Sequence, residues 1–134
     1  MILPPLLVSA VALVRDRRVL MVTARGRDVH YMPGGKIDAG ETAAQAAARE
    51  TREEVSLALD PAELVELFEV RTQAHGEPDG RMVHMTVFRA QTAAEPKPSA
   101  EVGAIHWVTT ADADRCPPAG RAVLERLAAL DLID

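Results

Sequence analysis

The sequence has a single cysteine, Cys116, so it cannot form an internal disulfide bond. A chain of this kind fits a reducing compartment, and we expect a cytoplasmic protein. Basic residues are not in excess, since 15 Lys and Arg against 20 Asp and Glu give a formal net charge of −5. Because nonspecific nucleic-acid binding requires a basic surface, this balance argues against DNA or RNA as a partner, but not against nucleotides.

Long hydrophobic segments are also missing. The apolar stretch within residues 1–14 is too short to cross a bilayer, it has no Lys or Arg before it as a signal peptide would, and Pro4-Pro5 interrupts it. We therefore expect a buried strand after a short lead and no membrane partner. No low-complexity run or internal repeat occurs, and 134 residues with 48% hydrophobic content predict one domain over residues 1–134.

The pattern of apolar residues and turn signals predicts a mixed sheet with helices packed on it. Strands are expected at 6–14, 18–23, 64–73, 81–90 and 104–109, with a short extended piece at 29–32. Asp16-Arg17 predicts a tight turn, and the turn-rich segment 75–80 predicts a hairpin over 64–90. Residues 91–100 are expected to form a surface loop, and a second helix is expected at 119–130 after Pro117-Pro118. The fold class is therefore α+β.

One further segment predicts a helix that concentrates negative charge. Thr42-x-x-Gln45 has the capping-box pattern, and the alanines that follow favour a helix. At about 100° per residue, Glu50, Glu53 and Glu54 fall on one side of it. The opposite stripe, which we expect to face the core, consists of Ala44, Ala48, Thr51 and Val55.

Carboxylates three and four residues apart destabilise a helix unless they are solvated or a cation neutralises them. An isolated E-x-x-E-E pattern usually marks only a solvated surface. Here Gly34-Gly35 lies shortly before the helix, at fixed distances from Glu41 and Arg49. Since Mg²⁺ prefers oxygen ligands and binds carboxylates together with substrate phosphates, the pattern predicts a Mg²⁺ site facing a polyphosphate.

These residues resemble the motif of Nudix hydrolases of the MutT-like type, G-x5-E-x7-R-E-U-x-E-E-x-G-U, where U is aliphatic. The matching positions within residues 35–57 are Gly35, Glu41, Arg49, Glu50, Glu53, Glu54 and Leu57. Tyr31-x-Pro-Gly-Gly resembles the family's lead-in to the motif, and the segment 101–108 resembles its late strand. The resemblance implies an α/β/α sandwich with a mixed β-sheet.

Two positions depart from the motif. Thr51 replaces an aliphatic residue, and we expect its hydroxyl to bond back to the Ala47 carbonyl with a small loss of packing. Ser56 replaces the glycine that would end the helix. Either Ser56 adopts the left-handed conformation common at that position, or the helix ends in another way.

The resemblance implies that Glu53 and Glu54 are metal ligands, with Glu50 as a further ligand or as the base that activates water. The Gly34 carbonyl is an additional candidate ligand. Mg²⁺, with Mn²⁺ as an alternative, would neutralise the phosphates. Glu101 is expected to bind metal or act as the base, the alternative being a solvated charge at the entry of a strand.

Arg49 is expected to have a structural role within the site. Because Arg forms planar, bidentate pairs with carboxylates, we expect it to hold Glu41 or another loop acid, with direct phosphate contact as the alternative.

Substrate contacts are expected near the Gly-rich turn. The candidates are Gly34, Gly35, Lys36, Arg25, Arg27 and Tyr31. The basic residues among them are equally compatible with a solvated edge. Tyr31 would stack on a base or, as the favoured alternative, cover the core.

The four histidines lack the close pairing typical of a zinc site, and Trp107 is expected to be a packing residue. His84 and His106 lie in predicted strands and are candidates to face the substrate pocket.

The expected activity is Mg²⁺-dependent hydrolysis of the diphosphate linkage in a nucleoside diphosphate derivative. Similarity to MutT-like members favours nucleoside triphosphates, including oxidised ones, giving a nucleoside monophosphate and pyrophosphate. One alternative is a non-catalytic nucleotide-sensing module, which would usually have lost motif carboxylates that this chain keeps. The other, an isoprenoid diphosphate isomerase, would want a cysteine near the pocket. A homodimer is compatible with the sequence.

Overall fold

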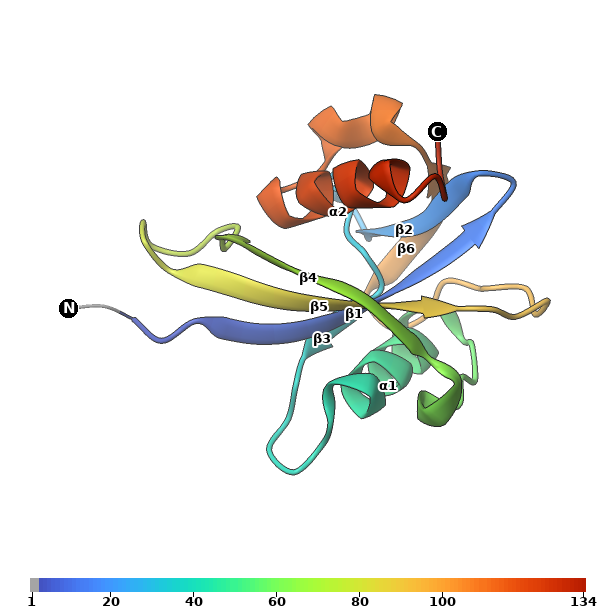
Figure 1. Cartoon of the computed structure of the whole chain (residues 1–134), viewed down its shortest axis with the longest axis horizontal. Helices are drawn as coiled ribbons and strands as arrows, with labels where there is room; N and C mark the ends of the chain where they lie inside the picture. The colour runs from blue at the N-terminus through green and yellow to red at the C-terminus, as the bar shows by residue number, and fades with distance from the viewer. Residues whose placement is uncertain (1–2) are drawn as a thin grey trace.

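The computed structural model describes residues 3–134, and Met1 and Ile2 of the expected lead lie outside this range. A mixed sheet lies between two helices, one on each face (Figure 1). The strands are β1 Leu6–Arg15, β2 Arg18–Ala24, β3 Gly34–Lys36, β4 Val65–Gln73, β5 Met82–Ala90 and β6 Val102–Val108. The helices are α1 Ala43–Val55 and α2 Pro118–Ala129, with short 3₁₀ helices η1 Pro61–Glu63 and η2 Thr110–Arg115. The predicted α+β fold, an α/β/α sandwich, is confirmed.

Strands β1 and β2 move apart near the centre of the sheet, and this separation positions the site. The strand order is β4-β5-β1-β2-β6, with β1 and β5 parallel, while β3 pairs with β1. β1 and β2 are paired only beside the Asp16-Arg17 turn. Farther along, the segment from Tyr31 to Lys36 lies between them, with Tyr31 bridging to Val22 and β3 pairing with β1. The Gly-rich turn is therefore embedded in the sheet.

The middle of β1, residues 9–13, is buried on both faces because each face carries a helix. Ala10 and Ala12 belong to the core that α2 covers with Val123, Leu124 and Leu127. Val11 and Leu13 belong to the core on the α1 side. A strand covered on both faces has a near-continuous apolar sequence, which is why this stretch could be taken for a targeting segment.

The predicted turn and most strand boundaries are confirmed to within two residues. Asp16 and Arg17 have φ values of 52° and 60°, the conformation that a two-residue hairpin turn requires. The extended piece expected at 29–32 is confirmed only at Tyr31, which forms a single bridge to Val22, and the strand of this region is β3, farther along the chain. A Cβ added to Gly34 would lie 2.2 Å from the Ser9 carbonyl oxygen. Glycine thus allows the close pairing of β3, whereas strand propensity favours bulkier residues.

Helix α1 begins with the predicted capping box, since Thr42 Oγ1 accepts from Gln45 N–H and the Gln45 side chain accepts from Thr42 N–H. The Thr51 hydroxyl donates to the Ala47 carbonyl at 2.7 Å, as expected. Ser56 ends the helix with a φ of 61°, so it accepts the left-handed conformation.

The expected core stripe of α1 is wrong in part. Ala44 is only half-buried, whereas Ala46, Ala47 and Glu54 are buried. The reason is that α1 packs against β3 as well as β1, which covers part of its acidic side. No helix within residues 3–134 is long and apolar enough to span a membrane.

Candidate active site

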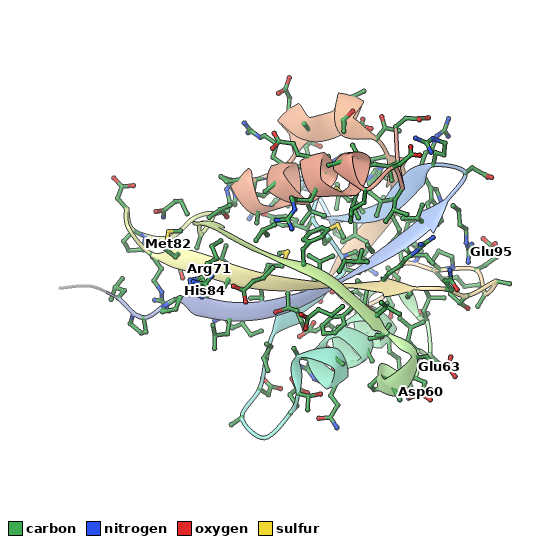
Figure 2. All side chains as sticks on the ribbon, viewed as in Figure 1. Asp60, Glu63, Arg71, Met82, His84 and Glu95 are labelled. Carbon is green, nitrogen blue, oxygen red and sulfur yellow. The ribbon has the colours of Figure 1, made fainter. Side chains whose placement is uncertain are left out.

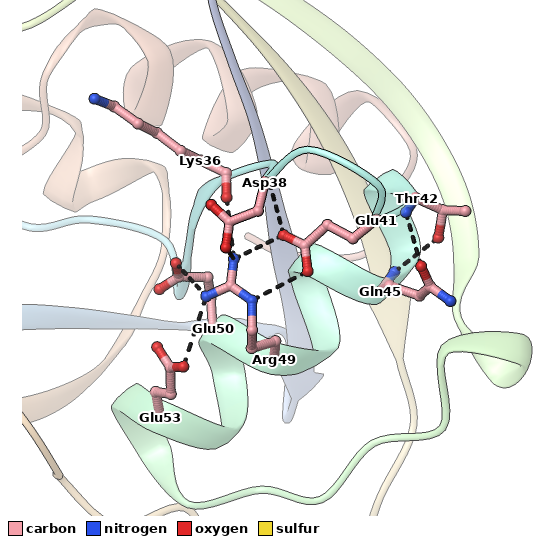
Figure 3. A network of polar contacts seen from close by, with 8 residues as sticks. All are labelled: Lys36, Asp38, Glu41, Thr42, Gln45, Arg49, Glu50 and Glu53. Carbon is pink, nitrogen blue, oxygen red and sulfur yellow. Dashed lines mark hydrogen bonds and ion pairs between the residues drawn. The ribbon is translucent and has the colours of Figure 1, made fainter.

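Arg49 is the centre of a polar network that joins α1 to the loop before it (Figure 3). Its Nε and Nη2 atoms donate to the two carboxylate oxygens of Glu41, at 3.1 and 2.7 Å. Nη2 also donates to the Lys36 carbonyl at 3.2 Å and lies 3.3 Å from the Asp38 carboxylate. The hydrogen bonds from Arg49 lower the pKa of Glu41. The network attaches the loop 37–42 to the helix.

Arg49 also holds two of the predicted ligands. Its Nη1 atom donates to Glu50 at 3.0 Å and lies 3.6 Å from Glu53 (Figure 3). The hydrogen bond to Glu41 raises the pKa of Arg49, so the guanidinium stays charged throughout the usual pH range. Arg49 therefore orients the carboxylates and partly neutralises them.

The two glycines of the turn bring the backbone against these carboxylates. Gly34 N–H donates to Glu54 Oε1 at 2.8 Å. A Cβ added to Gly35 would lie 2.6 Å from the carboxylate carbon of Glu50. A side chain at Gly35 would therefore displace Glu50, which explains the need for glycine there.

Glu54 is the most perturbed acid of the site. It is 8% exposed, and within residues 3–134 no Lys or Arg forms an ion pair with it. Burial raises its pKa to about 8, with further increases from the charges of Glu50, Glu101 and Glu53, against the opposing hydrogen bond from Gly34. A buried carboxylate without a cationic partner favours the binding of a cation.

Glu101 reaches the site because the loop before β6 crosses the end of α1. The N–H groups of Lys97 and Ser99 donate to the carbonyls of Val55 and Glu54, both at 2.9 Å. Glu101 then lines the same cleft as Glu54, and its charge contributes to the raised pKa of both Glu50 and Glu54. For Glu50 the largest cause of the raised pKa is burial.

The donor chemistry fits a hard divalent cation, since the groups present are carboxylates and a backbone carbonyl. Within residues 3–134, no three His, Cys, Asp or Glu side chains are already arranged to hold a metal ion. The reason is visible in the network: Arg49 draws Glu50 and Glu53 toward itself, and Glu54 faces Gly34 N–H. Binding would require these side chains to turn toward the ion.

A cleft of about 390 Å³ adjoins these acids. Tyr31, Gly34, Gly35, Glu54 and Glu101 all contribute to its lining, which is otherwise mostly apolar. Tyr31 is 40% exposed, so part of the residue faces solvent at the cleft, and its role as a stacking or a core-covering residue stays a prediction.

The basic candidates do not line this cleft. Lys36 has an exposed side chain and takes part in the Arg49 network only through its carbonyl. Arg25 is exposed, and Arg27 lines a second cavity of about 470 Å³ together with residues 28–30.

The histidines lie differently from the prediction. His84 is opposite Arg71 in the β4–β5 hairpin and does not line the cleft (Figure 2). His106 lines the second cavity, with Nε2 3.0 Å from Thr23 Oγ1 and its ring centroid 4.3 Å from that of His30. His30 and His75 line the cleft instead. No pattern in the sequence indicates that either histidine lines the cleft, because the loop after β2 and the turn after β4 meet only in the tertiary structure.

The model of the NUDIX domain matches residues 5–127. Among solved structures, a MutT NUDIX hydrolase from Burkholderia pseudomallei has a TM-score of 0.74 and 26% identity, covering 93% of this chain and 99% of that one. The E. coli ORF135 protein has a TM-score of 0.76 and 21% identity, with 96% and 92% covered. An Ap4A hydrolase from C. elegans, determined as a binary complex, has a TM-score of 0.70 and 20% identity, with 93% and 96% covered. A search of curated proteins gave no match.

Because the family model matches nearly the whole chain, the chain belongs to the Nudix family. Its class within that family is the pyrophosphohydrolases, enzymes that act on acid anhydrides.

Proposed function

We propose that this protein hydrolyses the diphosphate linkage of a nucleoside diphosphate derivative in a Mg²⁺-dependent reaction. The observation that supports this most strongly is Glu54, a buried carboxylate without a cationic partner, held by the Gly-rich turn at the edge of a cleft. Nudix hydrolases generally use divalent metal ions. The oxygen donors here suit Mg²⁺, with Mn²⁺ as an alternative.

In this proposal Glu50, Glu53, Glu54 and the Gly34 carbonyl hold the metal. When bound, Mg²⁺ would neutralise the phosphates and lower the pKa of an attacking water. Arg49 keeps Glu50 and Glu53 on the side of the helix that faces the turn. The general base is then Glu50 or Glu101, each of which lies close enough to Glu54 to raise its pKa.

We further propose nucleoside triphosphates, including oxidised ones, as the substrates, with a nucleoside monophosphate and pyrophosphate as products. The similarity to a MutT NUDIX hydrolase supports this choice of substrate. Because the fold is also similar to that of an Ap4A hydrolase, a dinucleoside polyphosphate should be tested beside the triphosphates. The cleft is large enough for one base and sugar, but among residues 3–134 no Lys or Arg lines it to bind a second group of phosphates.

The test is product release from a panel of nucleoside triphosphates, oxidised dGTP, Ap4A, ADP-ribose and sugar nucleotides, with Mg²⁺ or with EDTA. We expect turnover that requires Mg²⁺ and falls at least about 100-fold in Glu54→Gln, because the metal supplies several kcal/mol of transition-state stabilisation. Glu125→Gln, an exposed position on α2, is the matched control and should behave as the wild type.

Two outcomes would contradict the proposal. Nucleotide binding without turnover of any panel member would indicate a sensing module. Turnover that persists in EDTA and in Glu54→Gln would place the chemistry outside the carboxylate cluster.

A further inference from the structure

The cleft has one aromatic wall. Among residues 3–134, Tyr31 is the only Phe, Trp or Tyr that lines it, since Phe68 and Phe88 are buried in the core and Trp107 packs beneath Arg15. Most of the remaining lining is apolar and comes from β1, β5 and α2, through Leu6, Val8, Val83, Met85 and Ala119. A surface of this kind favours an uncharged, flat group over a sugar, whose hydroxyls need polar partners.

Tyr31 is presented by a fixed backbone. Its N–H and C=O groups form a pair of hydrogen bonds with Val22 of β2, at 2.9 and 2.8 Å. The side chain is 40% exposed, so a large part of it remains free for contact. Tyr31 therefore offers an exposed ring on a backbone whose position is set before any ligand binds.

The ring of His75, which lies in the turn after β4, is a neighbour of the Tyr31 ring, which lies after β2. The two ring centroids are 6.2 Å apart, and the planes are inclined by 65°. The turn that carries His75 is held by Gln73, whose amide donates to the Ala74 and Pro78 carbonyls at 3.2 and 2.9 Å and accepts from Gly80 N–H at 2.8 Å. Because the Gln73 amide is used in this way, this turn presents the His75 ring to a ligand rather than the Gln73 amide.

We infer that Tyr31 and His75 form an aromatic corner that receives the planar heterocycle of the substrate. The heterocycle stacks on the Tyr31 ring, and the inclined His75 ring contacts its edge, the two arrangements that aromatic groups prefer. Residues 31–34 span at most about 10 Å, so the corner lies no farther from Gly34 than roughly the length of a sugar and its first phosphates. The inference rests on the proposed function in one respect, namely that the phosphates of the substrate point from the corner toward the acidic residues.

The consequence is selectivity for nucleotides over diphosphates that lack a base. Stacking of a base on an aromatic side chain contributes about 10- to 100-fold in affinity. Neither ring takes part in the contacts that hold the acidic residues, so loss of the corner should affect binding of the base and leave binding of the phosphates unchanged.

The experiment measures binding, so its result does not depend on turnover. Calorimetry with Mg²⁺ would give Kd values for α,β-methylene analogues of the four nucleoside triphosphates and for methylenediphosphonate, which has no base. We expect Tyr31→Leu to weaken the best nucleotide analogue about 10- to 100-fold, with methylenediphosphonate unchanged. Tyr31→Phe, which keeps the ring, should bind within about threefold of the wild type, and His75→Ala should show a smaller loss.

Three results would overturn the inference: Tyr31→Leu binding the nucleotide analogue within twofold of the wild type, an equal loss for methylenediphosphonate, or a wild type that prefers the base-free ligand. Thermal melting of each variant would exclude misfolding as the cause of a loss, and Tyr31→Phe tests the ring if Tyr31→Leu is unstable. An absence of hydrolysis with these binding differences intact would refute the proposed function and leave the corner in place.

Discussion

Glu54→Gln should make the metal-free protein more stable at alkaline pH while removing its activity. Glu54 has a pKa of about 8 in the folded protein, against an ordinary value of 4.5. Between these two pH values the unfolded chain has released this proton and the folded protein retains it. Folding therefore takes up a proton, and the stability of the wild type falls as pH rises toward 8.

The size of the effect follows from the two pKa values. Each pH unit in this window lowers the free energy of unfolding by up to about 1.4 kcal/mol, which amounts to about 3 to 4 kcal/mol between pH 5 and pH 8. This is a large share of the 5 to 15 kcal/mol typical of a domain. Gln carries no charge at any of these pH values, and its carbonyl oxygen can still accept the Gly34 N–H. The variant should therefore lack this dependence on pH.

Urea denaturation in EDTA at pH 5, 6, 7 and 8 would measure the difference between the wild type and Glu54→Gln. We expect the difference to be small at pH 5 and about 3 to 4 kcal/mol in favour of the variant at pH 8. Glu125→Gln is the matched control, because Glu125 is exposed on α2 and its charge is not among those that raise the pKa of Glu54, and its curve should run parallel to that of the wild type. Mg²⁺ should then stabilise the wild type more than the variant.

A difference between the wild type and Glu54→Gln that stays constant from pH 5 to pH 8 would refute this reasoning. It would mean that ionisation of Glu54 does not lower the stability of the folded protein, and that burial of Glu54 does not favour cation binding.

Two further changes test the supports of the site. Ser56→Gly should raise the free energy of unfolding by up to about 1 kcal/mol, because Ser56 has a φ of 61°, a conformation that glycine adopts without strain. The substitution removes only one exposed hydrogen bond, 3.3 Å long, from the Ser56 hydroxyl to the Lys97 carbonyl. A loss of stability on urea denaturation would contradict this prediction. Arg49→Lys should lower kcat by about 10- to 100-fold with little change in melting temperature, because Lys cannot form the bidentate pair with Glu41 that sets the position of the carboxylates. Steady-state kinetics beside Arg52→Lys, an exposed neighbour, would check it, and an unchanged kcat would show that the pair has no catalytic consequence.

The features that the sequence alone predicted are those made by residues close together in the chain. The capping box of α1 depends on Thr42 and Gln45, and the hairpin after β1 on Asp16 and Arg17. The carboxylates share one side of α1 because helix periodicity places them there. Local hydrogen bonds and steric limits decide such features, and both can be read from neighbouring residues.

The tertiary structure decided which of these residues meet partners from elsewhere. Strand β3 formed at Gly34–Lys36 because β1 and β2 separate there, and packing of the Gly-rich turn on α1 buried Glu54 and raised its pKa. Glu101 came to the site because the loop before β6 donates to the last carbonyls of α1. Tyr31 and His75 met through the same non-local packing, which depends on the whole sheet and has no counterpart in the spacing of residues along the chain.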